Sequence, residues 1–487
     1  MRTLFAAVLV CSAPAFATFR CPARGGSPWR EYRGAHFILD TDAGDSDAQA
    51  LIQDLEHFHA LILQALVGEQ VAIPGHVRVL AFADQTAFEE IANNRNIAAY
   101  FTLGQLGEPT IVMPVRGAWE RPEMVAHELA HYLSRYLFPV QPAWFAEGLA
   151  EFVQTAARRA GGTAFNVAGS HVARGAGALG AVAGSVPIDL VSWIGYDQRP
   201  LPAKELLGWT GREQGESPRG HLYGWLLYHW LWNQRSKAFT QYQKLLGDDA
   251  DPASAWSAAF PEFNPKDAAA MARLDQALDQ YRRHGQFAFY KVEAKGDETV
   301  TGPVPISSAD LHLLIIPVAN WSASSSSKTP RGDAIDEALV EDPGNPMALF
   351  LKADRHEALA VRRAADSRAG DWRAWLFVGM TTQGADAEAA DRKAVAMNPE
   401  SALALNNLAW LLATTGRAKE ALPFANRALD LAPWDANTVD TLAEVAVQLG
   451  QCPQALQLEK RAVVTALGAK KMRERQSGIE SRCAEKK

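Results

Sequence analysis

A six-residue pattern recurs 34 residues apart in the last third of the chain. Residues 394–399 read AVAMNP and residues 428–433 read ALDLAP, and a similar segment, ALVEDP, occupies residues 338–343. A fixed period of this length is typical of stacked helical hairpins, each of which buries its apolar face only against its neighbours. The period therefore predicts an all-α repeat array over residues 308–468, followed by a C-terminal helix and tail over residues 469–487.

Within the clearest unit, leucine and alanine residues fall where a tetratricopeptide repeat places its helix-packing residues. These positions are Leu405, Leu408, Leu412, Ala421, Ala425, Ala428 and Pro433. The region resembles a tetratricopeptide array, which implies a concave surface that docks a peptide or protein partner. A helical buttress for the N-terminal part of the chain fits the same pattern, and both interpretations stay open here.

Length and charge limit the remaining classes of function. At 487 residues the chain exceeds what one hydrophobic core usually supports, so two or three domains are expected. The net charge is -7 and acidic and basic residues are interspersed, so the sequence does not indicate a basic surface for binding nucleic acid. No later apolar run reaches the roughly 18 residues of a membrane-spanning helix, so no transmembrane segment is expected in the mature chain.

The first residues are typical of a secretory signal peptide. Arg2 precedes a short apolar core at residues 4–10, and Ala15 and Ala17 form a small-x-small cleavage pattern. The sequence predicts a signal peptide over residues 1–17, cleavage after Ala17, and export to the periplasm or the exterior. Residues 18–34, rich in Gly, Pro and Arg, are expected to be irregular.

A mixed α+β region is expected over residues 35–290. Period-two or β-branched runs predict strands at 36–39, 77–82, 100–103 and 110–113, the last two as a hairpin. Longer periodic segments predict helices at 45–66, 86–93, 122–137, 142–158, 219–233, 236–246 and 266–284. The glycine-rich segment 161–184 is expected to be a loop, either beside a substrate cleft or as a plain surface insertion.

The segment HELAH at residues 127–131 contains two candidate metal-binding histidines. Pro122 favours a helix start before it, and Pro139 favours a helix end after it. Spacing of four residues places His127 and His131 on one helical face, one turn apart, where two imidazoles can bind a single Zn²⁺ ion. The apolar residues of the same helix form a separate stripe that can face the core. The two histidines are therefore candidate metal ligands.

A third ligand is expected on the following helix, WFAEGLAE at residues 144–151. His131 lies six residues before the expected end of the first helix, and Glu147 lies five residues after the expected start of the second. At about 1.5 Å per residue, both lie about 8 to 9 Å from the connecting turn, so an antiparallel hairpin brings them level. The sequence predicts one zinc ion held by His127, His131 and Glu147.

A helix with HELAH followed by a helix with WFAEGLAE resembles the gluzincin metallopeptidases, in particular the peptidase-MA-like domains. The resemblance covers about residues 30–290, and its specific part is residues 120–155. It implies an α+β zincin-like metallopeptidase domain over residues 35–290 and zinc-dependent hydrolysis of peptide bonds. The substrate expected from this resemblance is a peptide or a protein.

The resemblance also assigns roles to individual residues. Glu128 is the expected general base, which takes a proton from the attacking water, and Glu151 is the expected acidic group that orients a ligand histidine. Tyr223 is the first candidate for a donor to the tetrahedral oxyanion, with His221 as the alternative. Residues 110–113 lie where related enzymes have an edge strand that pairs with extended substrate, although the segment taken by itself favours an ordinary core strand.

Removal of the signal peptide leaves three cysteines, Cys21, Cys452 and Cys483. If the last two helices form an antiparallel hairpin, Cys452 and Cys483 meet at one end of it, and an oxidising compartment permits a disulfide between them. A buried free thiol at Cys452 is the alternative.

Two classes of function fit this sequence. The first is a working zinc peptidase whose repeats dock its substrate. The second is a catalytically inactive scaffold or adaptor whose repeats bind a protein partner. The presence of Glu128 together with all three candidate ligands favours the first.

Overall fold

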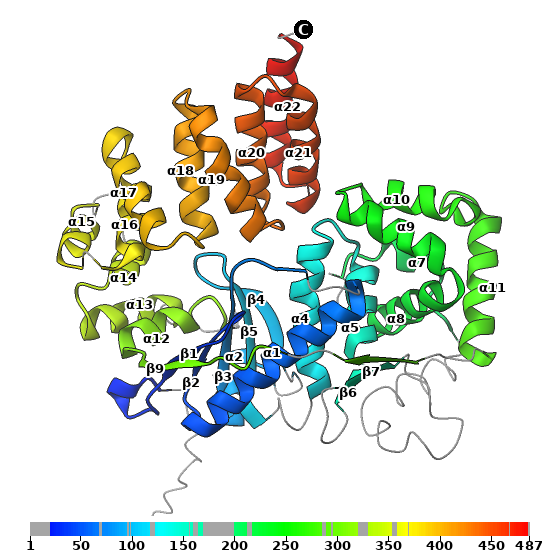
Figure 1. Ribbon diagram of the computed structural model, residues 1–487, viewed down its shortest axis with the longest axis horizontal. Helices are drawn as coiled ribbons and strands as arrows, with labels where there is room; N and C mark the ends of the chain where they lie inside the picture. The colour runs from blue at the N-terminus through cyan, green and yellow to red at the C-terminus, as the bar shows by residue number, and fades with distance from the viewer. Residues whose placement is uncertain are drawn as a thin grey trace, which may run out of the picture.

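A computed structural model describes residues 20–485 apart from 68–70, 95–96, 98, 117–121, 155, 159–163, 169–198, 212–216, 285–288, 294–295, 320–329, 353–357, 369 and 467. Figure 1 shows a mixed sheet with helices around it and, along one side, a row of helical pairs that ends at the C-terminus. The expected signal peptide, residues 1–17, and its cleavage site after Ala17 lie outside the described residues. Among the described helices, none combines the length and the apolar composition that crossing a bilayer requires.

The main sheet contains six strands in the order β4-β5-β3-β2-β1-β9. Their bounds are β1 Arg30–Arg33, β2 Phe37–Thr41, β3 Val77–Phe82, β4 Tyr100–Leu103, β5 Pro109–Pro114 and β9 Thr301–Pro305. Strands β2, β3 and β5 run parallel, whereas β4, β1 and β9 each run antiparallel to a neighbour. The four strands expected from the sequence are present, and β4 with β5 forms the expected hairpin.

The structure confirms the core-strand alternative for residues 110–113 and corrects the expectation of an irregular segment 18–34. Residues 110–113 belong to β5, which lies between β3 and β4, so the edge strand of the hairpin is β4. The reason is that Ile111, Val112 and Met113 are all buried, as in a strand covered on both faces. Part of segment 18–34 is also regular, because β1 pairs with β2 and with the distant β9.

Two helices cover one face of the main sheet. Helix α1 (Asp45–Val67) and helix α4 (Pro122–Leu137) share a core with inward-facing strand residues such as Leu39, Val79 and Ile111. The opposite face packs Leu80 and Val112 against α2 (Gln85–Ala92) and α12 (Ser308–Ile315). Successive residues of a strand point to opposite faces, which is why Val79 and Leu80 enter different cores.

A helical region follows α4. Its members are α5 Ala143–Gln154, α7 Ala203–Gly208, α8 Ser217–Gln234, α9 Ser236–Gly247, α10 Pro252–Ala259 and α11 Ala268–His284. Helices α5 and α8 cross at two glycines: a Cβ atom on Gly148 would lie 2.5 Å from the Gly224 carbonyl oxygen. Because neither glycine has a side chain, the two backbones can approach this closely, and Glu147 and Glu151 of α5 face α8.

A second, three-stranded antiparallel sheet has the order β6-β7-β8. Its strands are Ala156–Arg158, Ala164–Ala168 and Phe289–Glu293. The helix expected at 142–158 therefore ends at Gln154, and residues 164–168 of the glycine-rich segment are a strand rather than a loop. Residues 169–184 of that segment lie outside the described residues.

The C-terminal part of the chain is an array of helical pairs. Its helices are α13 Pro330–Glu341, α14 Pro346–Lys352, α15 Ala358–Ser367, α16 Trp372–Thr381, α17 Gly384–Met397, α18 Ala402–Thr414, α19 Ala418–Leu431, α20 Ala436–Gln448, α21 Cys452–Thr465 and α22 Lys470–Ala484. Helices α17, α19 and α21 start 34 residues apart, in agreement with the sequence period. The residues matched to helix-packing positions, such as Leu405, Leu412 and Ala425, are buried.

The final two helices are joined covalently. Cys452 at the start of α21 and Cys483 near the end of α22 form a disulfide with Cα atoms 5.6 Å apart. Cys21 is a free, buried thiol. The bridge ties the terminal helix to the array, whose last apolar surface needs such a cover.

A buried carboxyl group on α21, next to the terminal helix, predicts that the stability of the protein depends on pH. Glu459 on α21 is fully buried, and burial together with the Asp440 carboxylate raises its pKa to about 8. Because the folded state holds this proton up to a higher pH than the unfolded state, stability falls as the pH rises from the ordinary glutamate range through 8. We expect Glu459→Gln to be more stable than the wild-type chain at pH 9, with a smaller difference at pH 5. Urea unfolding at pH 5 and pH 9 measures the free energy of unfolding of each protein, and a substitution of the exposed Glu474, Glu474→Gln, is the control. The same difference between Glu459→Gln and the wild-type chain at both pH values would contradict the prediction.

The repeat array is anchored on helix α4. Trp434, in the loop before α20, is 8% exposed and packs edge-on against Tyr132 and Tyr136 of α4, with ring centroids 6.0 and 5.3 Å away. The Tyr136 hydroxyl donates to the Asp430 carbonyl oxygen. Trp434 belongs to the same core cluster as α1 and α4. The repeats are therefore continuous with the N-terminal core at this point.

Candidate metal centre

Helix α4 supplies the two imidazoles. Val125, Leu129 and Leu133 face the core of the main sheet, as the apolar stripe predicts. On another face of the same helix, the Nε2 atoms of His127 and His131 lie 3.1 Å apart. Their rings are nearly perpendicular, with an interplanar angle of 81°. Both Nε2 atoms lie within 4.8 Å of the third ligand atom of the group.

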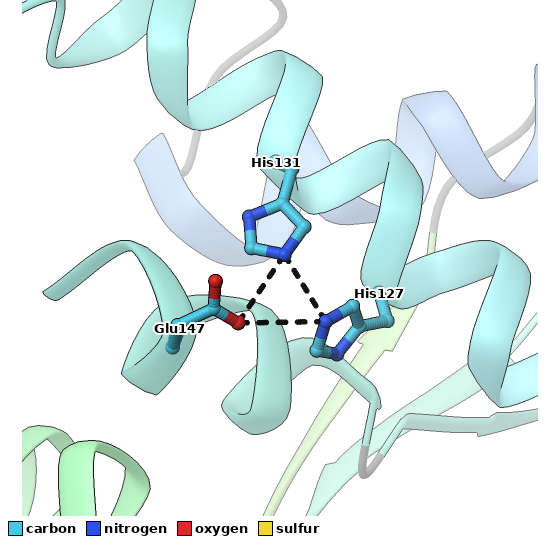
Figure 2. A group of neighbouring side chains, drawn as sticks. All are labelled: His127, His131 and Glu147. Carbon is cyan, nitrogen blue, oxygen red and sulfur yellow. Dashed lines mark hydrogen bonds and ion pairs between the residues drawn. The ribbon is translucent and has the colours of Figure 1, made fainter. Parts of the chain in front are cut away.

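Helix α5 supplies the third group, and Figure 2 shows the three side chains converging. The Glu147 Oε2 atom lies 3.7 Å from His127 Nε2 and 3.4 Å from His131 Nε2. Ligand atoms held tetrahedrally at about 2.0 to 2.1 Å from zinc are about 3.3 to 3.4 Å apart. The triangle of 3.1, 3.4 and 3.7 Å thus has the size that one such ion needs.

The electrostatics of this triangle favour a cation. Burial raises the pKa of Glu147, but His131, His221 and His127 outweigh that effect and lower it to about 2. For His131, burial lowers the pKa while the Glu147 carboxylate more than offsets it, so the pKa is raised. A half-buried carboxylate that stays ionised among imidazoles matches the donor set of a divalent metal ion. Within the part of the chain that the structure describes, this is the one group of His, Cys, Asp and Glu side chains with such convergence.

Glu128 lies on the same turn of α4 as His127. Its side chain is 8% exposed, and its charge opposes the lowering of the His127 pKa that burial and His131 cause. The carboxylate is thus close to the triangle without being part of it. This is the place that a general base beside a metal requires.

His221 reaches the centre from α8. Its Nδ1 atom lies 3.1 Å from Glu147 Oε2 and 3.6 Å from Glu151 Oε1. Burial lowers the pKa of His221, but the bond to Glu151 and the charge of Glu147 raise it overall. Glu151, expected to orient a ligand histidine, lies here beside His221, although its charge also acts on His127.

Tyr223 lines a cavity to which the three candidate ligands do not contribute. It lies two residues beyond His221, which is about 200° around the helix. Its side chain is 2% exposed and lines a separate cavity of about 340 Å³ together with Leu278 and Asp279 of α11. The sequence placed both residues on the correct helix, but only the crossing of α5 and α8 decides which face of α8 meets Glu147.

Comparisons with known proteins add little to this description. No protein-family model matches the chain, and no curated protein matches it. Among solved structures, the chain is similar to a thermophilic TPR protein of Thermus thermophilus, with 18% sequence identity and a TM-score of 0.27. That alignment covers 31% of this chain and 91% of the other.

Proposed function

We propose that this chain is a zinc-dependent peptidase of the gluzincin type, with a zincin-like N-terminal domain and tetratricopeptide-like repeats. The main supporting observation is that His127 Nε2, His131 Nε2 and Glu147 Oε2 lie within 3.7 Å of one another. The Glu128 carboxyl group is close enough that its charge acts on both histidines. The three donors fit Zn²⁺ in kind, in number and in spacing.

His127, His131 and Glu147 would hold a zinc ion, which would supply a Lewis acid and the means to lower the pKa of a water molecule toward about 7. Glu128 takes the proton of the attacking water and passes it to the leaving amine. The low exposure of Glu128 keeps competing bulk water away from this proton transfer. His127, His131 and Glu147 would hold the ion with three protein donors, the number found in catalytic zinc sites, whereas structural zinc sites have four.

We assign the oxyanion-stabilising role to His221 rather than to Tyr223. Its imidazole is held between Glu147 and Glu151 on the α8 side of the triangle. The two carboxylates favour the charged form of the imidazole, which can donate a hydrogen bond to a developing negative charge. Tyr223 lies about 200° around α8 from His221 and lines the cavity beside α11, so we do not assign the oxyanion-stabilising role to it.

Strand β4 is suited to hold the substrate backbone. It ends the order of the main sheet, and Phe101 on it packs near Tyr132, the neighbour of ligand His131. An edge strand can pair with an extended peptide through backbone hydrogen bonds. The substrate class is therefore a peptide or an unfolded protein segment.

A second candidate function is an inactive scaffold or adaptor, which the array of pairs from α16 to α21 favours. In that case the repeats bind a protein partner and the metal site is structural or vestigial. The retention of Glu128 beside three ligands argues for the enzyme, because a structural site needs no base.

We also propose export, with the mature chain in the periplasm or outside the cell. The disulfide between Cys452 and Cys483 supports this, because such bonds persist in oxidising compartments. The N-terminal signal pattern supports the same location.

Zinc content and cleavage, measured together, test the function. We expect one zinc ion per mature chain and hydrolysis of a reduced, carboxymethylated protein that stops when a chelator removes the metal and resumes when zinc is restored. Metal is measured by atomic emission, and cleavage sites by mass spectrometry. Bound zinc without any chelator-sensitive cleavage of this unfolded protein or of a peptide library would favour the scaffold.

A further inference from the structure

A cavity of about 580 Å³ separates the main sheet from the repeats, away from the three candidate ligands. One wall is formed by Arg78, Leu80 and Thr110 of β3 and β5, and by the loop 104–108 between β4 and β5. The other wall is formed by the N-terminal ends of α16 and α18 and by residues 431–434. Figure 1 shows the row of repeat helices above the main sheet, and the strands and the repeats supply these two sets of residues. The volume of the cavity falls within the roughly 300 to 1,000 Å³ of ligand sites.

The two walls are held at a fixed distance. Besides the Trp434 anchor on α4, the His76 Nδ1 atom lies 2.9 Å from Glu400 Oε2 across the rim. Arg461 of α21 also bonds Asp249, with its Nη1 atom 2.5 Å from Oδ2. With several contacts on different elements, the cavity is a built feature of the fold rather than a gap between loosely joined parts.

The lining favours a cationic and partly apolar occupant. Among the described lining residues are five carboxylates and three guanidinium groups: Glu31, Glu108, Asp310, Asp371, Glu400, Arg33, Arg78 and Arg373. Each guanidinium group already pairs with a carboxylate: Arg33 with Glu31, Arg78 with Asp40, and Arg373 with Asp371. The first turns of α16 and α18 are capped by their own Asp371 and Ser401 side chains. Four of the five carboxylates also have a basic partner: Glu31 with Arg33, Asp310 and Asp371 with Arg373, and Glu400 with His76. The carboxylates still outnumber the guanidinium groups, and Glu108 accepts from the Leu106 amide rather than from a basic side chain. The negative charge that no guanidinium group offsets therefore lies at Glu108, in a lining that also contains apolar residues such as Leu314 and Trp372.

The position of the cavity indicates that its ligand is a peptide segment rather than a small molecule. Its loop 104–108 directly follows edge strand β4, and Tyr132 in its lining is the residue after ligand His131. A peptide laid along β4 and running past Leu103 would enter the cavity. Backbone N–H groups and Lys or Arg side chains of such a segment match the acceptor oxygens there.

We propose that this cavity binds an extended, Lys- or Arg-containing polypeptide segment of the substrate, outside the part that lies at the metal centre. The proposal rests on the peptidase function proposed above. It makes the repeats one wall of a substrate site, so that unfolded chains bind more tightly than short peptides do.

The test uses the full mature chain carrying Glu128→Gln, so that a bound probe is not cut. The probe is a dye-labelled eight-residue peptide of alternating Val and Lys, and its control has Glu in place of Lys. Gly370 lines the cavity, and a Cβ atom there meets nothing within 4 Å, so Gly370→Trp places an indole in the cavity without a backbone clash. Gly478 on α22 has equally open surroundings, and Gly478→Trp is the matched control.

We expect fluorescence anisotropy to show about tenfold weaker binding of the Lys probe to Gly370→Trp, and no change for Gly478→Trp. The Glu probe should bind about tenfold more weakly than the Lys probe, with a difference that shrinks as salt rises. Glu108→Gln should also weaken the Lys probe while retaining an oxygen to accept from the Leu106 amide, which guards against a folding artefact.

Equal binding of the two probes, or equal binding by the two tryptophan variants, overturns the assignment. With Glu128 intact, Gly370→Trp should lose more activity on a long unfolded substrate than on a four-residue one, and Gly478→Trp should lose activity on neither. If the tryptophan variants bind the probes equally, zinc-dependent cleavage can still be observed. If no cleavage is observed, probe binding can still be measured by anisotropy. The two proposals therefore fail separately.

Discussion

Glu128→Gln is expected to keep its zinc and to lose between about 10²- and 10⁴-fold in kcat/KM, the range that general acid–base catalysis supplies. Glutamine has nearly the same volume but cannot accept the proton of the attacking water. Glu128 does not belong to the convergent triangle, so the three donors remain in place when it is changed. Hydrolysis of a quenched fluorescent peptide and atomic emission on the same sample measure both quantities.

The control for this variant is Glu205→Gln on α7, an exposed glutamate. It should match the wild-type chain in both measurements. Unchanged turnover in Glu128→Gln would remove that carboxylate from the mechanism. Loss of zinc from Glu128→Gln would mean that the residue acts through the metal site rather than on the proton.

Glu147→Gln is expected to weaken zinc binding by more than about 100-fold, because even outer partners of metal ligands contribute about 10- to 100-fold. The wild-type carboxylate remains ionised, since His131, His221 and His127 outweigh the effect of burial and hold its pKa at about 2. Removing that charge leaves two imidazoles, which cannot complete a zinc site. Competition with a chromophoric chelator measures the change in affinity, and peptide hydrolysis should fall with it.

Glu151→Gln is the matched comparison, one turn further along α5. Its carboxylate lies beside His221 and should contribute less to metal affinity than Glu147 does. The opposite ranking, with Glu147→Gln fully loaded and Glu151→Gln depleted, would make Glu151 the third ligand. The same result would require a rearrangement of α5 relative to α4.

Several features of this protein follow from short stretches of sequence. The four-residue spacing of His127 and His131 is fixed by helix geometry, which does not depend on the rest of the fold. The hairpin of α4 and α5 is almost as local, because a short turn joins the two helices and sets Glu147 level with His131. The 34-residue period likewise sets the starts of α17, α19 and α21.

Other features depend on contacts between distant segments. One strand of the β4–β5 hairpin pairs with β3, and the other is therefore the edge strand. The residue pattern of either strand alone does not predict which of the two pairs with β3. Trp434 looks like an ordinary loop residue in the sequence, yet it enters the core beside α4. A large aromatic residue placed just after a repeat's terminal proline was the only available signal.

What the sequence determined by itself was the set of three candidate ligands, since helical spacing and a tight turn bring His127, His131 and Glu147 together without contacts from the rest of the fold. What only the tertiary structure decided was the surroundings of that set: His221 rather than Tyr223 faces Glu147, and the repeats form a wall of a cavity next to β4. The physical reason is that a helix's own period fixes which residues share a face, whereas the face that meets a neighbour is set by packing, here by the contact of Gly148 with Gly224.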